Sequence, residues 1–258
     1  MRCVVIDVGN TSTSLALYAD GRISRFSHVT GGVVKNPDAC AAAVRRAAKG
    51  GVCGAVLGSV VPTTNPLWRA LVMRELGCAP LVVRAGIPMA VAIDYPDPET
   101  IGADRLANAA GGGVKYGAPL IVADFGTALT FDIVTRKRGY IGGVIAPGLP
   151  LMTDYLHERT ALLPHVAPGG ACPRIGRSTR GAIQIGARIG YRGMVREIVG
   201  YLLQTLGPDV TLVGTGGFAR WVLTGIGLPF VIDPHLTVFG LGTIFEQNAE
   251  SNSSRRTS

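Results

Sequence analysis

The sequence of 258 residues lacks the features of several common protein classes. Its five cysteines are widely spaced and form no C-x-x-C pair, so we expect neither a disulfide framework nor a zinc site. No apolar run approaches the ~18 residues of a membrane-spanning helix, and the four apolar residues that precede Asp7 are too few for a signal-peptide core. We therefore expect a reduced, cytoplasmic protein that does not span a membrane.

Two common nucleotide-binding motifs are absent or incomplete. The sequence contains no G-x-x-x-x-G-K-[ST], which excludes a P-loop. Residues 214–219 follow an expected strand and fit G-x-G-x-x-A, and Asp233 stands 19 residues after Gly214. Only 25 residues follow Asp233, fewer than half a dinucleotide-binding domain needs. We therefore expect a glycine turn whose backbone can lie against a flat or phosphorylated part of a ligand.

Charged side chains are scarce, at 16%, whereas hydrophobic residues make up 47%, which predicts well-filled cores. The formal net charge is +8, but the arginines are scattered apart from Arg45-Arg46 and Arg136-Lys137-Arg138, and no aromatic residues are interleaved with them. We therefore expect a solvated surface with a mild attraction for polyanions, and no nucleic-acid binding. The four histidines have no metal-ligand spacing and are interpreted as structural or surface groups.

The chain is organised around residues 4–18, where an apolar strand, a polar tip and a second apolar strand predict a hairpin. Gly9 lets a ligand approach the backbone closely, and Asn10 with the four hydroxyls after it supplies small hydrogen-bonding groups suited to phosphate. The pattern returns at residues 121–134, where Asp124 aligns with Asp7 and Gly126 with Gly9. Two such hairpins, about half a chain apart, predict a duplicated domain.

Strands precede helices in both halves of the chain. This order predicts an α/β fold of two duplicated ribonuclease-H-like domains whose hairpin tips face each other across a cleft. We place the N-terminal domain at residues 1–117, the C-terminal domain at 118–248 and a disordered polar tail at 249–258. A long helix is predicted over residues 178–206, with room for a second packing partner such as another subunit. Its inward-facing row is predicted to be Ile183, Ala187, Met194, Ile198 and Leu202.

Three aspartates are candidate functional residues, and each has a structural alternative. Asp7 and Asp124 can cap turns, but as a pair flanked by hydroxyls they suit the cation-assisted binding of a polyphosphate. Asp104 stands in the first turn of a helix expected at residues 103–116, where the helix dipole favours an acidic residue without any function. The residues alone leave both interpretations of Asp104 open.

Several motifs, taken together and in order, resemble the type III pantothenate kinase family over nearly the whole chain. They lie at residues 7–11, 102–105, 124–127, 140–148, 176–179 and 216–217. The resemblance implies two actin-like ATPase domains, the fold of the superfamily that contains acetate and sugar kinases, Hsp70 and actin. It also implies transfer of the γ-phosphoryl group of ATP to the primary alcohol of pantothenate, the first step of coenzyme A biosynthesis.

The same resemblance assigns roles to individual residues. Asp104 matches the catalytic base, and Asp124 matches the ligand of the monovalent cation, K⁺ or NH₄⁺, that the family requires alongside Mg²⁺. The substrate-binding positions are Tyr95, Gly102, Ala103, Asp104, Arg105 and Thr179. Relatives supply the residue matching Thr179 from the neighbouring subunit, which implies a homodimer. The ATP-binding positions are Asp7, Val8, Gly9, Asn10, Thr11, Ser12, Thr13, Ser14 and Thr127.

Two alternatives stay open from the sequence. One is another small-molecule kinase on the same scaffold, such as a sugar or acyl kinase. Leu129 and the bulky turn at residues 214–218 depart from the family pattern, and these departures concern the nucleotide pose and not the proposed base. The other is a non-enzymatic relative, since a transcriptional accessory factor shares these motifs. The intact Asp104, Asp124 and Thr127 and the lack of an added DNA-binding segment weigh against this second alternative.

Overall fold

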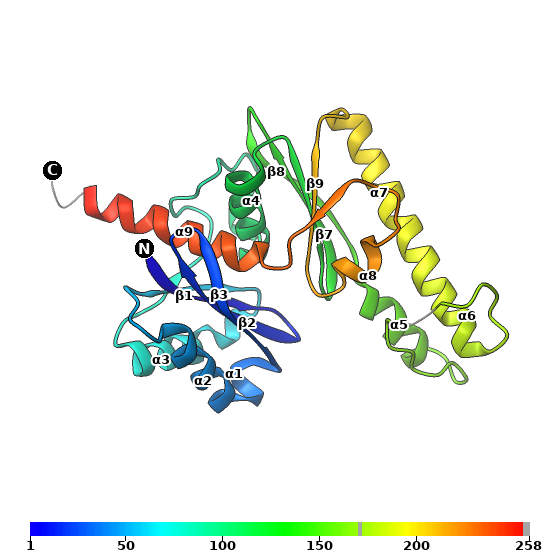
Figure 1. Ribbon diagram of the computed structural model, residues 1–258, viewed down its shortest axis with the longest axis horizontal. Helices are drawn as coiled ribbons and strands as arrows, with labels where there is room; N and C mark the ends of the chain where they lie inside the picture. The colour runs from blue at the N-terminus through cyan, green and yellow to red at the C-terminus, as the bar shows by residue number, and fades with distance from the viewer. Residues whose placement is uncertain (170–171, 255–258) are drawn as a thin grey trace. The chain divides into compact units, whose positions relative to one another are not determined.

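A computed structural model describes residues 1–169 and 172–254 of the chain. In this part, the strands form two five-stranded sheets (Figure 1). The chain divides into two compact units. The first comprises Met1–Gly117, Val134–Gly142 and His235–Ser258, and the second comprises Ala118–Ile133 and Gly143–Pro234. Over the described residues, no helix has both the length and the apolar character needed to cross a bilayer.

The sheet of the first unit starts from an antiparallel meander. β1 (Arg2–Val8) pairs with β2 (Ser12–Ala19), and β2 pairs with β3 (Arg22–Thr30). β4 (Ala55–Ser59) and β5 (Leu81–Val82) extend the sheet on the other side of β1 in the parallel direction. The strand order is β3-β2-β1-β4-β5, which places the predicted polar tip between β1 and β2.

Helices cover both faces of this sheet, which explains why β1 is apolar at almost every position. On one face, Val4 and Ile6 pack in one buried cluster with Trp68 and residues of the helix that follows β3. The helices near this face are α1 (Gly32–Lys35), α2 (Pro37–Ala48) and α3 (Asn65–Leu76). The helices on the opposite face are α4 (Ala103–Tyr116) and α9 (Leu236–Ser254). Short 3₁₀ turns at Pro62–Thr64 and Pro98–Thr100 precede α3 and α4.

The sheet of the second unit repeats the first. Its strands are β6 (Leu120–Phe125), β7 (Ala128–Thr135), β8 (Gly139–Pro147), β9 (Thr211–Thr215) and β10 (Phe230–Ile232). The order β8-β7-β6-β9-β10 matches that of the first sheet strand for strand, and β9 runs parallel to both β6 and β10. The duplication predicted from the two hairpins is therefore confirmed.

The long helix predicted over residues 178–206 is divided in the structure. α6 (Thr179–Ile185) and α7 (Tyr191–Leu206) are joined by a π-helical segment, Gly186–Gly190. A π turn contains one residue more than an α turn, so the buried row shifts along the sequence. Met194 and Ile198 are only half-buried. The buried row is Ile183, Ala187, Tyr191, Val195, Val199 and Leu202.

Two short helices complete the second unit, and the end of the chain belongs to the first. α5 (Leu149–Glu158) follows β8, and α8 (Ala219–Leu223) follows β9, where the sequence predicted only a glycine turn. α9 groups with the first unit, although it follows the second in sequence. It continues to Ser254, past residue 249 where the polar tail was expected to begin, and residues 255–258 lie outside the described part.

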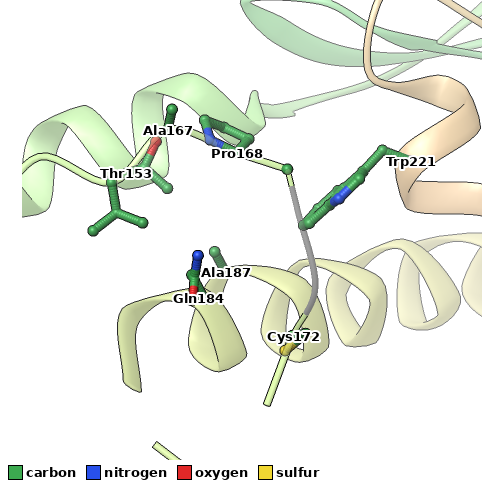
Figure 2. A pocket seen from close by; sticks show the side chains of 9 residues that line it. Thr153, Ala167, Pro168, Cys172, Gln184, Ala187 and Trp221 are labelled. Atoms are coloured by element: carbon green, nitrogen blue, oxygen red, sulfur yellow. The ribbon is translucent and has the colours of Figure 1, made fainter. Parts of the chain in front are cut away.

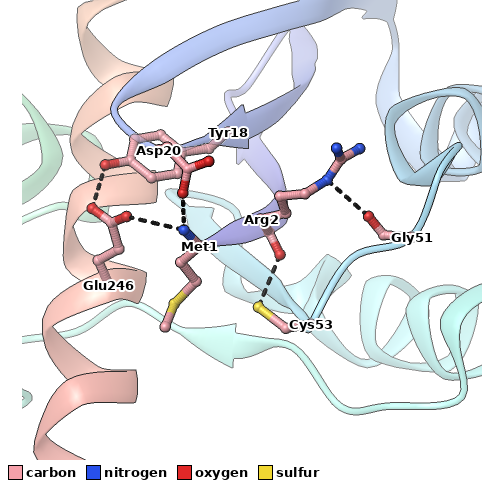
Figure 3. A network of polar contacts seen from close by, with 7 residues as sticks. All are labelled: Met1, Arg2, Tyr18, Asp20, Gly51, Cys53 and Glu246. Carbon is pink, nitrogen blue, oxygen red and sulfur yellow. Dashed lines mark hydrogen bonds and ion pairs between the residues drawn. The ribbon is translucent and has the colours of Figure 1, made fainter.

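α9 is tied to the meander by a polar network (Figure 3). The Tyr18 hydroxyl donates to Glu246 Oε2 at 2.5 Å, and the Met1 amino group lies 3.8 Å from Glu246 Oε1. Burial and the hydrogen bond to Glu246 raise the pKa of Tyr18. A Cβ on Gly242 would lie 2.1 Å from Tyr18 Cδ2, so only glycine lets α9 rest on this ring. The contact joins the last helix to the second strand.

Candidate active site

The predicted phosphate loop of the first unit is a tight turn between β1 and β2. The Gly9 N–H donates to Ser12 O at 2.9 Å, and the Gly31 N–H donates to Thr11 O at 2.9 Å, which braces the tip from outside. Asn10 and Thr11 are exposed, whereas the Thr13 side chain is fully buried. The tip therefore presents Asn10, Thr11 and backbone groups, while Thr13 faces the interior.

The corresponding tip of the second unit lies between β6 and β7. Its Gly126 N–H donates to Ala128 O at 3.1 Å, and Thr127 is half-buried. A Cβ on Gly148 would lie 2.0 Å from Thr127 O, so the N-cap of α5 can approach this tip only because it is glycine. Each hairpin tip is therefore contacted by a glycine that directly precedes a helix. This glycine is Gly31, before α1, in the first unit and Gly148, before α5, in the second.

Asp124 lies beneath the predicted glycine turn. A Cβ on Gly216 would lie 2.4 Å from Asp124 Oδ1 and 2.7 Å from the backbone of Phe125, and the Phe218 N–H donates to Phe125 O at 3.2 Å. Nowhere among the described residues do three His, Cys, Asp or Glu side chains form a metal-binding group. One carboxylate does not by itself make a metal site, so a hard cation bound at Asp124 would need further oxygen ligands, such as those of a bound nucleotide.

Asp104 occupies the first turn of α4. Its Oδ1 accepts a hydrogen bond from the Arg105 N–H at 2.7 Å, and a Cβ on the N-cap Gly102 would lie 2.6 Å from that oxygen. Burial raises the pKa of Asp104, and the neighbouring backbone N–H and the charge of Arg105 oppose this rise. A carboxylate with a raised pKa accepts a proton more readily than an exposed one, which suits a base.

Tyr95 and Arg105 come together although they lie on separate segments. The Arg105 Cζ is 5.8 Å from the centroid of the Tyr140 ring, and the Tyr95 ring centroid is 6.1 Å from the same ring. Tyr140, at the start of β8, was noted in the sequence only as part of a motif and was given no role. The spacing of these residues in the sequence does not predict that Tyr140 contacts Tyr95 and Arg105.

Thr179 lies in the second unit, where it is exposed at the start of α6. Ser178 caps this helix as predicted, because its Oγ accepts a hydrogen bond from the Gly181 N–H at 3.1 Å. Asp124 and Thr127 also belong to the second unit, whereas the first phosphate loop, Tyr95 and residues 102–105 belong to the first. The predicted site residues are thus divided between the two units.

The second unit also contains a small cavity that involves none of the predicted residues (Figure 2). The Trp221 ring of α8 and Ala187 of the π segment contribute to its wall. Its lining residues are Thr153, Val166, Ala167, Pro168, Gly169, Cys172, Gln184, Ala187 and Trp221. Because this lining is largely apolar and has no charged residue, it does not suit a phosphate.

Comparison with known proteins decides the family. The family model described as type III pantothenate kinase matches residues 3–200. The chain belongs to the type III pantothenate kinase family. The Akkermansia muciniphila type III pantothenate kinase is 50% identical over 153 residues, which cover 59% of this chain and 63% of that protein. The Moorella thermoacetica type III pantothenate kinase is 34% identical over 95% of this chain and 99% of that protein. The family consists of kinases with an alcohol acceptor, and the chain is such an enzyme.

Solved structures place this member of the family in a wider fold class. A protein described as a Baf family transcriptional activator from Campylobacter jejuni has a TM-score of 0.60 at 15% identity, over 96% of this chain and 99% of that one. A ROK family glucokinase from Streptomyces griseus has a TM-score of 0.53 at 18% identity, over 97% and 100%. Likenesses at such identities concern the fold alone. The kinase has the two-domain α/β fold of actin-like ATPases and ROK kinases, as predicted.

Proposed function

We propose that the chain transfers the γ-phosphoryl group of ATP to the primary alcohol of pantothenate, giving 4'-phosphopantothenate at the start of coenzyme A biosynthesis. Membership of the family supports this substrate pair. The observation that carries the proposal is Asp104, a half-buried carboxylate in the first turn of α4 whose pKa is raised by partial burial. It stands beside Arg105, whose cation suits an anionic substrate.

Asp104 is the proposed general base. In phosphoryl transfer most of the acceleration comes from alignment and from neutralising charge, and the base removes the hydroxyl proton as the new bond forms. General-base assistance typically contributes about 10²–10⁴-fold. Its place at the helix N-terminus orients the carboxylate, since Oδ1 accepts a hydrogen bond from the Arg105 N–H at 2.7 Å.

The two hairpin tips are the proposed ATP contacts. In the first unit the proposed contacts are residues 7–14. In the second unit the proposed contact is Thr127. Asn10 and Thr11 are exposed at the first tip, and their small polar side chains suit phosphate oxygens, which supports these positions. Because Thr13 is buried, its contribution is structural or through its backbone. The nucleotide carries its Mg²⁺, which neutralises part of the phosphate charge.

Asp124 is the proposed ligand of the monovalent cation, K⁺ or NH₄⁺. The place of the Asp124 carboxylate beside the glycine turn and next to the second hairpin tip supports this role. Na⁺ is smaller than K⁺, so it fits oxygen ligands that are spaced for K⁺ less well. We propose that Asp124→Asn weakens the dependence of turnover on K⁺ over Na⁺ while it leaves the midpoint of thermal unfolding close to that of the wild type.

A homodimer is proposed because large apolar side chains are exposed on neighbouring parts of the second unit. These are Leu151, Tyr155, Leu162, Ile175 and Ile189. Thr179 lies among these segments, at the start of α6, which supports a contact with the substrate of the partner chain. Light scattering tests the assembly, with twice the 26.8 kDa of one chain as the expected mass.

The test of the function is a coupled ATPase assay with and without pantothenate, applied to the wild type and to Asp104→Asn. We expect the variant to keep its affinity for ATP and to lose at least about 10²-fold in kcat. Asp209→Asn, at an exposed aspartate in the loop after α7, is the matched control and should keep full turnover. Near-normal turnover of Asp104→Asn contradicts the role of the base.

The substrate class has its own outcomes in this assay. Turnover with another alcohol but not with pantothenate would favour a different small-molecule kinase of the same fold. Binding of pantothenate without any turnover by the wild type would favour a non-enzymatic accessory relative. Either result overturns the proposed reaction.

A further inference from the structure

Tyr140 is the buried aromatic residue on which two segments of the first unit meet. It is fully buried at the second position of β8. The Arg105 guanidinium of α4 lies 5.8 Å from its ring centroid, within the range of a cation–π interaction. The Tyr95 ring lies 6.1 Å away at an interplanar angle of 44°. One ring therefore touches two residues that are proposed to bind the substrate.

The backbone of Tyr140 also fixes the segment that carries Tyr95. The Tyr140 N–H donates to Ala92 O at 2.8 Å, and the Asp94 N–H donates to Tyr140 O at 2.9 Å, so residues 92–94 add a short parallel bridge to the start of β8. Arg138 forms an ion pair with Asp94. These contacts hold the segment before Tyr95 in one register.

Glycines on both sides of Tyr140 make this approach possible. Gly139 has φ +67°, and a Cβ there would lie 2.1 Å from Ala92 O. Gly142 has φ +106°, and a Cβ there would lie 3.0 Å from Tyr95 Cε2. A side chain at either position would push the segment away, so β8 is built to hold it close.

We propose that Tyr140 is a positioning residue that orients Arg105 and Tyr95 for the acidic substrate. This inference rests on the proposed function, in which both residues bind pantothenate. A free arginine side chain has many rotamers, and its charge is useful only in those that reach the anion. The face of a buried aromatic ring restricts the guanidinium to a plane, so the side chain is arranged before the substrate arrives.

The experiment compares Tyr140→Leu with Tyr140→Phe. Loss of a cation–π contact predicts a rise of about 3- to 30-fold in the KM for pantothenate for Tyr140→Leu. The KM for ATP should stay within about twofold, because the nucleotide loops make no part of this contact. Tyr140→Phe keeps the ring face and should restore a KM near that of the wild type. Tyr201→Leu, at an exposed tyrosine of α7, is the control and should change neither constant.

Two further experiments distinguish a positioning role of Tyr140 from general damage to the core. They are a double-mutant cycle with Arg105 and the replacement of the Tyr140 ring by one of the same shape. Arg105→Gln removes the cation and with it the contact to the ring, so adding Tyr140→Leu to it should raise KM little further. Replacing the ring at position 140 by pentafluorophenylalanine keeps its shape and removes its negative face. This variant should behave as Tyr140→Leu does, which also covers the case in which Tyr140→Leu does not fold.

Several outcomes overturn the inference while the proposed function stands. They are a fluorinated ring with an unchanged KM for pantothenate, full additivity of Tyr140→Leu and Arg105→Gln, or equal rises in the KM for both substrates. The failure of the proposed function would look different, because the wild type itself would then not phosphorylate pantothenate.

Discussion

The helix crossing between α4 and α9 offers a sharp test of how the fold positions Asp104. A Cβ on Gly240 of α9 would lie 1.9 Å from Ala107 O and 2.6 Å from the carbonyl carbon of the same residue. On the other helix, a Cβ on Gly111 would lie 2.8 Å from Gly240 Cα. The two helix backbones therefore touch at this point, and Gly240→Ala must separate them.

The magnitude follows from opposing effects. The Ala107 carbonyl would have to move by more than about 1 Å to restore an ordinary contact. Overpacking of this kind typically costs about 1–3 kcal/mol, and a clash with backbone belongs at the upper end. Alanine in place of glycine returns about 1 kcal/mol of helix propensity. We expect a net loss of about 2 kcal/mol, which is a fall of about 4–8 °C in Tm for a chain of this size.

Activity should fall more than stability. Asp104 stands one turn before Ala107 on the same helix, so a displacement of α4 moves the proposed base. A misplacement of about 1 Å can cost about 10²-fold in rate. We therefore expect Gly240→Ala to lose kcat at temperatures where the variant is still folded.

The assay is thermal unfolding by circular dichroism together with kcat, for Gly240→Ala and a matched control. The control is Gly200→Ala, at an exposed glycine of α7 where an added Cβ meets nothing within 4 Å. It should gain about 0.5–1 kcal/mol from helix propensity and keep its activity. A Gly240→Ala protein as stable and as active as the wild type would refute the close helix crossing.

Two further predictions concern ionisable groups. Tyr18→Phe removes the hydroxyl that donates to Glu246 Oε2 at 2.5 Å. The free energy of unfolding, measured by urea titration, should fall by about 1.5–3 kcal/mol. An unchanged midpoint of unfolding argues against the contact. Burial raises the pKa of Asp104, and a base works only when deprotonated, so kcat/KM should fall as the pH drops through a value above the ordinary ~3.9 of aspartate. If Asp104→Asn keeps the same acid limb in its residual activity, another group is responsible for it.

Local signals predicted much of the secondary structure. The limits of the helix at Pro37–Ala48 agree with local signals, because proline is favoured at the first helical position and Lys49-Gly50-Gly51 follows its end. The helix at Ala103–Tyr116 also has its predicted limits, with Gly117 after it. The two hairpins predicted the pairing of β1 with β2 and of β6 with β7, since a tight turn joins the two strands of each pair.

Other features depend on contacts between distant segments and had no local signal. The π turn at Gly186–Gly190 shifted the buried row of the long helix, which periodicity at a constant 3.6 residues per turn does not predict. The grouping of α9 with the first unit depends on Gly240 and Gly242, which accept the backbone of α4 and the ring of Tyr18. In sequence these two residues are only glycines in a helix.

The sequence by itself determined which residues are candidates for the chemistry, because Asp7, Asp104 and Asp124 stand in local motifs whose turns and helix starts are set by their neighbours. Only the tertiary structure decided the environment of these groups. Burial, which raises the pKa of Asp104, and the stacking of Arg105 on Tyr140 arise where segments far apart in the chain exclude water together. The free energy of a charged group depends on all that surrounds it, and a linear motif contains only part of those surroundings.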